Sequence, residues 1–558
     1  MLIGTLLCLF ALLGVATPAL AQSADTILVG GRVVTLDARS TIAEAMAVRG
    51  DKITAVGGAA DIKRLAGAKT LVIDLAGRMV IPGLIDSHMH AIRAGLRFGR
   101  EVSWIGSPSI SDAMGRLRDA ASRVPPGDWI VVAGGWTPQQ FKERRRPTQA
   151  DLMKAVPDHP VYIQLFYGAV LLTPKGFKKL GIKTDADVPP RGKIQRGPDG
   201  RPTGWIYGKA ATITGLYNKL PPPTLAQSIA GTRGYFRELN RFGLTGVIDP
   251  GGYNLAPEQY EALFRLWRRR GLTVRVSYSI SAPNRGSELA DYQTMTRFLP
   301  MRTGDDWLRF NGIGERVTWG MNNKSEPTDA DKDAYYRIGV WAAERGMTLT
   351  MHWPRDSSVH HLLELFKRIG HTVPFRHLRW SVAHLHDASI ESLRRMKALG
   401  LGWLMQNRLY FASTRSLLAH GDALSRTPPL KSAVGMGLRI GGGTDAHRVM
   451  SYNPFISLRW MIDGLTVEGV ETRGAAELAT REQALRIYTT GSAWFAHDEQ
   501  RRGALTVGRL ADLAVLSKDY LEIPVRQISA IQSLLTMVGG RIVHAAGPYK
   551  ALEAPVVK

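Results

Sequence analysis

His88 and His90 stand two residues apart, directly after an apolar run at 79–86 that predicts a buried β-strand. Side chains at i and i+2 point to the same face of a strand, so the two imidazoles should lie side by side. Neutral imidazole is a good ligand for zinc and neighbouring divalent metals. The sequence therefore predicts a metal site at the C-terminal end of this strand.

Further ligand-type residues lie at or near the ends of other apolar runs. They are Glu315 in the run 309–317, His352 after 348–351, His384 after 378–383 and Asp445 after 438–444. If these runs are parallel strands of one barrel, their side chains converge at a common mouth. His386, two residues beyond His384, is then a candidate substrate-binding residue.

A unit of helix, glycine and apolar strand recurs from residue 258 onward. Helices are expected at 258–270, 330–345, 389–399 and in a shorter stretch ending at 436, followed by Gly271, Gly346, Gly400 and Gly437. Glycine after a helix adopts the left-handed conformation easily, and the apolar run after it suits a strand buried on both faces. Eight strands are expected, at 80–86, 244–249, 273–280, 309–317, 347–352, 379–384, 402–406 and 438–443. The predicted fold is α/β, a (β/α)8 TIM-like barrel with its chemistry at the C-terminal strand ends.

Two regions fall outside this repeat. Residues 96–235 are too long for one unit and predict an insertion after the first strand, where loops set selectivity. Residues 26–57 and 510–546 alternate apolar and polar side chains and each contain a Gly-Gly-Arg turn, which predicts a small β-sandwich built from both termini. The expected domains are sandwich parts at 22–78 and 501–558 around a barrel at 79–500.

Aromatic residues supply candidates for a substrate pocket. Trp136 and Phe141 lie in the insertion, Tyr167 follows a short apolar run there, and Trp353 follows the candidate ligand His352. An aromatic side chain near the centre of a large barrel can equally be part of the core. Trp136, Tyr167 and Trp353 are therefore expected either to contact substrate or to pack in the interior.

The composition indicates a globular protein with a basic surface. The chain has 558 residues, of which 44% are hydrophobic and 22% charged, with a formal net charge of +24. The basic clusters are dispersed, and no groove-reading motif or pattern of alternating basic and aromatic residues accompanies them. We expect a small-molecule substrate and no nucleic-acid partner, and the sequence leaves self-association open.

Residues 1–21 have the character of a signal peptide. The segment holds no charged side chain, is apolar over 2–15, and ends in Ala19-Leu20-Ala21. The only cysteine, Cys8, lies inside it, so a processed chain would have neither disulfide nor thiolate. We expect a periplasmic or secreted bacterial protein without stable membrane insertion, whose metal is held by histidines and carboxylates.

Several motifs together resemble a known group of enzymes. They are Ile81-Pro82-Gly83-Leu84-Ile85-Asp86-Ser87-His88-Met89-His90, Gly442-Gly443-Thr444-Asp445 and Gly508-Arg509-Leu510-Ala511-Asp512-Leu513. In these the chain resembles the amidohydrolase superfamily, specifically its family-3 branch of metal-dependent hydrolases related to N-substituted formamide deformylases, from about residue 26 to 550. The resemblance implies a distorted barrel, a terminal sandwich and one or two divalent metals, usually zinc. By position it makes His88, His90, His352 and His384 ligands and Asp445 the last-strand carboxylate.

The chain also departs from that pattern. Many relatives have a carboxylated lysine at the end of strand four, where this chain offers Glu315. We expect Glu315 to bridge two metals, the alternative being that it pairs with Arg316 or Arg355 and the site holds one. The insertion differs from relatives at 166–169 and 207–209, which leaves the substrate open.

The expected reaction follows from the ligand set. A divalent ion with an open coordination position lowers the pKa of water toward about 7 and polarises a carbonyl group. Asp445 would take the proton and return it to the leaving amine, so we expect hydrolysis of the C–N bond of an amide, formamide or cyclic amide. The alternatives are ester or lactone hydrolysis, deamination of a heterocycle, a non-catalytic periplasmic binding protein and a basic polyanion binder.

Overall fold

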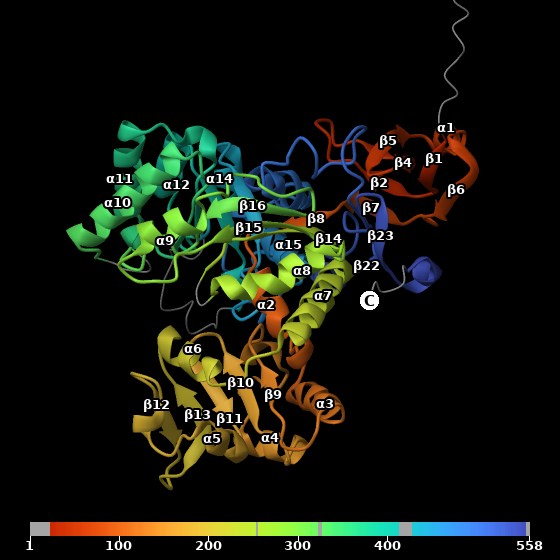
Figure 1. The fold of residues 1–558 in the computed structure, drawn as a ribbon. Coiled ribbons are helices and arrows are strands. Elements are labelled where there is room, and N and C mark those ends of the chain that lie inside the picture. The colour runs from red at the N-terminus through yellow and green to blue at the C-terminus, as the bar shows by residue number, and fades with distance from the viewer. Residues whose placement is uncertain (1–22, 253–254, 322–325, 412–426, 554–558) are drawn as a thin grey trace, which may run out of the picture.

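The protein has an α/β fold in which parallel sheets, a separate mixed sheet and strands from both termini form distinct parts (Figure 1). This computed structural model describes residues 23–252, 255–321, 326–411 and 427–553. The predicted signal segment at 1–21 lies outside them. Within these ranges no helix is long and apolar enough to cross a membrane.

Eight parallel strands form two four-stranded sheets. The first contains β8 (Leu84–Asp86), β14 (Leu244–Asp249), β15 (Arg275–Ile280) and β16 (Leu308–Ile313). The second contains β17 (Thr350–Trp353), β18 (Ser381–His384), β19 (Gly402–Gln406) and β20 (Ile440–Gly443). Each lies at a predicted strand, in the predicted order.

Backbone contacts connect the two parallel sheets at both of their edges, between β16 and β17 and between β8 and β20. A parallel bridge joins Ile313, the last residue of β16, to Leu349 just before β17. After β8, the Ser87 amide donates to the Gly442 carbonyl at 2.9 Å, and the His88 carbonyl accepts from the Asp445 amide at 2.8 Å. The first and last strands therefore deliver their C-terminal residues to the same place.

The predicted first strand is broken at Gly83. Its first half, β7 (Met79–Pro82), pairs with β2 and β21 of the terminal sheet, and only β8 joins the parallel sheet. A Cβ at Gly83 would lie 2.2 Å from the Thr245 side chain, so glycine allows the close approach where the chain changes sheets. The expectation of one continuous strand at 80–86 was wrong for this reason.

Helices alternate with the parallel strands. They are α2 (Ala91–Arg97), α7 (Leu225–Arg241), α8 (Glu261–Arg268), α9 (Glu288–Met295), α10 (Asp329–Glu344), α11 (Asp356–Thr372), α12 (Ile390–Leu399), α14 (Leu430–Gly435) and α15 (Pro454–Asp463). Gly346, Gly400 and Gly437 adopt left-handed φ angles of 65°, 75° and 70°, as expected. After α8 that conformation falls on Arg270 (φ 54°) and not on Gly271, so this one glycine prediction was wrong.

The inserted region contains a five-stranded sheet of its own. Its strands, in spatial order, are β12 (Lys193–Arg196), β13 (Pro202–Tyr207), β11 (Ala169–Leu172), β10 (Val161–Leu165) and β9 (Ile130–Val132). Its helices are α3 (Ile110–Ala121), α4 (Gln149–Ala155), α5 (Pro174–Leu180) and α6 (Ala210–Asn218). In Figure 1 this part projects below the parallel strands. Because β10 supplies Ile163 to one apolar cluster and Tyr162 to another, its sheet is buried on both faces.

Both chain termini contribute strands to a shared region. One sheet holds β1 (Ala24–Val29), β4 (Ala45–Arg49), β5 (Lys52–Gly57) and β6 (Ala66–Asp74), flanked by α1 (Ala59–Lys63). The other holds β2 (Arg32–Val34), β3 (Ile42–Ala43), β7, β21 (Leu513–Leu516), β22 (Ser533–Val538) and β23 (Arg541–Ala545). Leu28 and Val48 of the first sheet share a buried cluster with Val515 and Met537 of the second. Short helices α16 (Arg481–Arg486) and α17 (Ser492–Phe495) precede the C-terminal strands.

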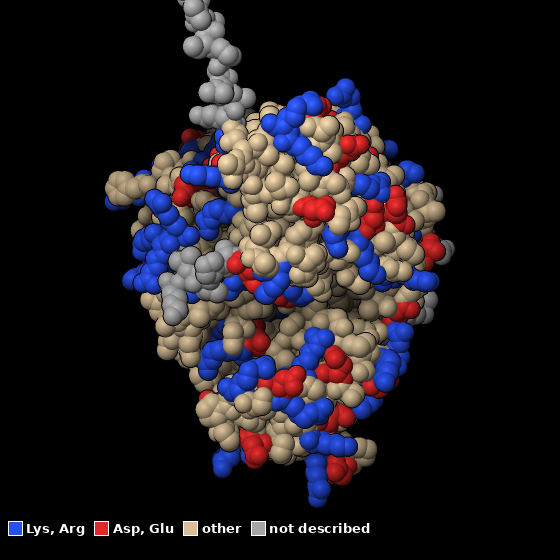
Figure 2. All heavy atoms as spheres, turned by 90° about the vertical axis from the view of Figure 1, so that its right-hand side faces the viewer, with Lys and Arg blue, Asp and Glu red and all other residues tan. Residues whose placement is uncertain are grey.

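The basic charge is spread over the surface. On the face drawn in Figure 2, Lys and Arg side chains are interspersed with Asp and Glu side chains and with large uncharged areas. The excess of cations over anions in the sequence therefore does not gather into one continuous basic groove on this face.

Candidate metal centre

The segments that follow β8 and β20 carry candidate ligand residues and are joined by hydrogen bonds. The buried Asp86 side chain accepts from the His88 amide at 3.0 Å and from the Thr444 hydroxyl at 2.7 Å. The His90 amide in turn donates to the Ala446 carbonyl at 3.1 Å. These bonds fix the ends of β8 and β20 against each other, which places the His88, His90 and Asp445 side chains in one cluster.

Glu315 lies at the centre of the four predicted histidine ligands. Its Oε2 is 3.2 Å from His88 Nε2, 3.0 Å from His352 Nδ1 and 3.1 Å from His384 Nε2. Its Oε1 is 3.2 Å from His90 Nε2. The glutamate side chain is only 2% exposed, so this carboxylate is enclosed by imidazoles.

The side chains form two potential metal-binding groups that share one member. The first contains His88, His90 and Glu315, and the second Glu315, His352 and His384, with the ligand atoms of each group within 4.8 Å of one another. Asp445 borders the first group, its Oδ1 being 3.3 Å from His90 Nε2. The six residues that the sequence proposed as ligands therefore lie together, with the glutamate between two sets of imidazoles.

Hydrogen bonds at Nδ1 leave Nε2 of His90 and of His384 facing the cluster. His90 Nδ1 lies 2.9 Å from the Gly251 carbonyl, and His384 Nδ1 lies 2.8 Å from Gln406 Oε1. A hydrogen bond from Nδ1 fixes the tautomer in which Nε2 carries a free lone pair. Among the described residues, Nδ1 of the fully buried His88 has no hydrogen-bond partner, and its Nε2 faces the Glu315 carboxylate at 3.2 Å. A buried imidazole whose polar atoms are not all satisfied, beside a carboxylate and other imidazoles, fits a divalent metal.

The electrostatics keep both acids ionised. Burial acts to raise the pKa of Glu315, but His352 and His90 hold it well below its usual range. Burial also opposes ionisation of Asp445, and His90, His384 and His88 lower its pKa overall. Burial and Arg93 disfavour protonation of His90, yet Glu315 and Asp445 raise its pKa to about 10. The site thus collects negative charge that a cation can neutralise.

The backbone at the site adopts rare conformations. His384 has φ of 74° and Asp445 has φ of 55°, both in the left-handed region that non-glycine residues seldom occupy. Such conformations persist only where the surrounding structure holds them, and they concentrate at functional sites. At these two positions they aim the side chains into the ligand cluster.

The arginines considered as alternative partners of Glu315 interact elsewhere. Arg316 stacks over Trp319 at 3.6 Å and donates to the Ala282 carbonyl at 3.2 Å. Arg355 lies 3.6 Å from Asp387. The contacts of Glu315 are with histidines, as the bridging hypothesis requires.

The four predicted substrate-contact residues separate into two pairs. Trp136 is fully buried in the insertion, stacked on Phe141 and donating to the Gln164 carbonyl at 2.8 Å, and Trp353 is 1% exposed and faces Ser358. Tyr167 and His386 are half-buried, and Tyr167 interacts electrostatically with His90 and Asp445. The His386 ring lies 5.4 Å from that of His384, and burial together with His384 keeps its pKa well below the usual range.

Supporting residues were missed by reasoning from the sequence. Asp249 accepts from the Ile92 amide at 2.8 Å and from the Gly251 amide at 2.9 Å, and so positions the carbonyl that faces His90. It ends a predicted strand, which was a usable signal. Asp86 lies two residues before His88 and was equally visible, whereas nothing in the sequence pairs Gln406 with His384.

Comparison with known proteins agrees with a site built to bind a metal ion. The amidohydrolase family model matches residues 71–544. The N-substituted formamide deformylase of Arthrobacter pascens is 22% identical over 93% of this chain and 98% of its own. The putative amidohydrolase YtcJ of Bacillus subtilis (strain 168) is 21% identical over 92% and 98%.

Solved structures with low sequence identity share the fold. An uncharacterised metal-dependent hydrolase from Pyrococcus furiosus aligns with a TM-score of 0.62 at 19% identity, covering 89% of this chain and all of that one. Atrazine chlorohydrolase TrzN from Arthrobacter aurescens TC1, complexed with zinc, aligns with a TM-score of 0.53 at 15% identity over 96% and 97%. The chain belongs to the amidohydrolase family and is a hydrolase that acts on carbon–nitrogen bonds.

Proposed function

We propose that this protein is a metal-dependent hydrolase that cleaves the C–N bond of an amide, formamide or cyclic amide. The observation that carries the proposal is the contact of one enclosed carboxylate, Glu315, with four imidazoles that lie at the ends of three different strands. The similarity to a protein named N-substituted formamide deformylase supports an amide-type substrate.

The ligand set fits one or two zinc ions. His88 and His90 would hold one ion and His352 and His384 the other, with Glu315 bridging them and Asp445 completing the first group. When bound, the metal lowers the pKa of water and polarises the carbonyl group of the substrate. The all-nitrogen and oxygen donor set is compatible with zinc, and the zinc in the triazine hydrolase structure favours the same ion.

Asp445 is the residue best placed to move protons. Its side chain is 15% exposed, whereas that of Glu315 is 2% exposed, so of the two carboxylates Asp445 is the one open to a substrate. Its lowered pKa keeps it ionised and able to accept a proton from water, which it then returns to the departing nitrogen. Tyr167 and His386 border the same opening and would contact the substrate. Trp136 and Trp353 would support the site from the interior.

The finer architecture that we propose is a distorted (β/α)8 barrel at 79–500, with an insertion at 96–235 and a β-sandwich made from 22–78 and 501–558. The contacts that link β16 to β17 and β20 to β8 support closure of the eight strands. The apolar cluster shared by the two terminal sheets supports the sandwich. We further propose export to the periplasm or medium, supported by the uncharged apolar segment at 1–21.

Replacement of Asp445 by Asn tests the reaction. We expect Asp445→Asn to keep its metal content while kcat on an amide and formamide panel falls by about 10²- to 10⁴-fold, the usual contribution of a positioned acid–base group. Asp463→Asn, which removes a mostly buried carboxylate paired with Arg459, is the control and should leave kcat nearly unchanged. A near-normal rate for Asp445→Asn would remove this residue from the proton transfers.

The same purified protein separates the alternative functions. Lactones and aminated heterocycles in the panel report ester hydrolysis and deamination, which would use the same site. Treatment with a chelator should abolish turnover, and added zinc or manganese should restore it. A protein that binds no metal and gains no activity from either ion would be a non-catalytic member of the fold.

A further inference from the structure

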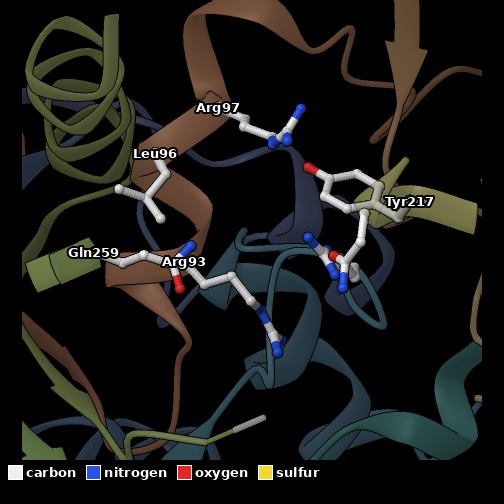
Figure 3. A pocket seen from close by; sticks show the side chains of 7 residues that line it. Arg93, Leu96, Arg97, Tyr217 and Gln259 are labelled. Atoms are coloured by element: carbon white, nitrogen blue, oxygen red, sulfur yellow. The ribbon is translucent and has the colours of Figure 1, made fainter. Parts of the chain in front are cut away.

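A small cavity lined by arginines lies over helix α2, which begins directly after His90. Its volume is about 60 Å³, enough for a few waters or one small polar group. Figure 3 shows Arg93, Leu96 and Arg97 on this helix facing Tyr217 and Gln259. The described residues that line it are Arg93, Leu96, Arg97, Tyr217, Asn218, Gln259 and Arg448, three cations and no carboxylate.

Arg448 is the unusual member of this lining. The residue is only 5% exposed, and its guanidinium stacks on the Tyr217 ring at 3.8 Å. Its Nε has no hydrogen-bond partner, and within the described part of the chain no ion pair includes it. A buried guanidinium without a paired anion is costly, because it has lost water without gaining an acceptor.

The Glu101 carboxylate, which acts on Arg448 electrostatically, is engaged by other groups. The Glu101 carboxylate accepts from the Tyr217 hydroxyl at 2.5 Å and lies 3.0 Å from His447 Nε2. Arg97, over the same tyrosine ring at 4.9 Å, donates to the Pro221 carbonyl at 2.9 Å. Arg448 is therefore a cation available to an incoming oxyanion.

The cavity is tied to the metal centre by the chain itself. Arg448 follows the ligand-type residue Asp445 by three residues, as Arg93 follows His90, and the His90 amide donates to the Ala446 carbonyl. The hydroxyl of Tyr167 lies in the field of both groups: burial raises its pKa, but Arg93, Arg448 and His90 lower it overall. Tyr167 thus interacts electrostatically both with arginines of the cavity and with His90 and Asp445 of the ligand cluster, which places the cavity beside that cluster.

We propose that Arg448 binds a carboxylate group of the substrate, so that the enzyme acts on acidic amides such as N-formyl or N-acyl amino acids. A planar carboxylate matches the guanidinium fork, and the small cavity suits that group alone. This inference rests on the proposed amide hydrolysis and names the substrate class for it.

Matched substrate pairs test the pocket through kinetics. N-formylphenylalanine is compared with N-formylphenethylamine, and N-acetylphenylalanine with N-acetylphenethylamine, because each pair differs only in the carboxylate. We expect the wild type to prefer the acidic member in kcat/KM by about 10- to 100-fold, the range of charge-assisted hydrogen bonds. Arg448→Gln should remove the preference mainly by raising KM, and Arg448→Lys should retain part of it. Arg297→Gln, a loss of the same charge at an exposed site, should keep it.

A binding measurement keeps the inference separate from the proposed reaction. Phenylacetate and the neutral phenylacetamide are titrated into chelator-treated protein, so that no metal can bind the carboxylate, with circular dichroism confirming that each variant is folded. Phenylacetate should raise the unfolding temperature of the wild type and of Arg297→Gln, but not of Arg448→Gln. If this binding pattern is observed but no amide is hydrolysed, the carboxylate site is supported and the proposed reaction is refuted. Equal kcat/KM within each pair, or phenylacetate binding that survives in Arg448→Gln, would overturn the carboxylate pocket.

Discussion

The Glu315→Gln substitution probes the centre of the site with almost no change in shape. It removes the negative charge that lies between the four imidazoles while leaving one oxygen that can still bind a metal. Each imidazole contact of the carboxylate spans 3.0–3.2 Å. At such a distance two unit charges attract by about 5 kcal/mol for an effective dielectric constant of about 20.

A divalent ion held by these side chains would lose an attraction of at least this size. Because the glutamine oxygen and the imidazoles remain, we expect a net loss of roughly half, or about 2–3 kcal/mol, which corresponds to a roughly 100-fold weaker metal affinity. Both groups share Glu315, so the substitution should weaken both. We expect metal content to fall from about two ions per chain to one or none, since a carboxylate can bridge two divalent ions.

The assay is metal content by plasma mass spectrometry after dialysis against buffered free zinc, together with kcat. Glu477→Gln provides the control, because Glu477 is a buried carboxylate that accepts from the Ser432 amide and hydroxyl away from the histidines. It should keep the wild-type metal content. If Glu315→Gln bound zinc with wild-type stoichiometry and affinity, the bridging role would be refuted.

Two further predictions concern the framework. Arg501, Arg309 and Arg275 overcome partial burial to lower the pKa of Asp306 from 3.8 to about 2, so its stabilising effect is complete above pH 4 and is lost as pH falls toward 2. Since Asp306 is about one-third exposed, solvent screening reduces the effect to about 1 kcal/mol. Asp306→Asn should therefore lower the urea midpoint of metal-free protein at pH 7, and the difference from wild type should shrink at pH 3; a gap that is unchanged at pH 3 would contradict this. Gly83→Ala should lower the unfolding temperature by several degrees, because its Cβ would overlap Thr245 at 2.2 Å and overpacking costs about 1–3 kcal/mol. Gly168→Ala is the matched control, because a Cβ there has nothing within 4 Å. If the two variants had the same unfolding temperature, the chain would not need glycine at the break between β7 and β8.

The sequence by itself identified the candidate ligand residues and the order of the strands. His88 and His90 share a face because strand periodicity is local, and Glu315, His352, His384 and Asp445 are recognisable because each lies near the C-terminal end of an apolar run. Glycine after a helix likewise predicted the left-handed turns at Gly346, Gly400 and Gly437, since that preference is a property of a single residue.

Only the tertiary structure decided which side chains meet. Three contacts depend on distances between segments far apart in the chain: Glu315 with four imidazoles, Gln406 with His384, and Arg448 with the Tyr217 ring. The break at Gly83 has the same origin, because a locally continuous apolar run serves two sheets whose strands come from elsewhere. Local sequence patterns show which face of a strand is buried, but they do not show which distant segment packs against that face. The interior positions of Trp136 and Trp353 could not be separated from a pocket lining by residue type alone, since the same aromatic side chains suit both.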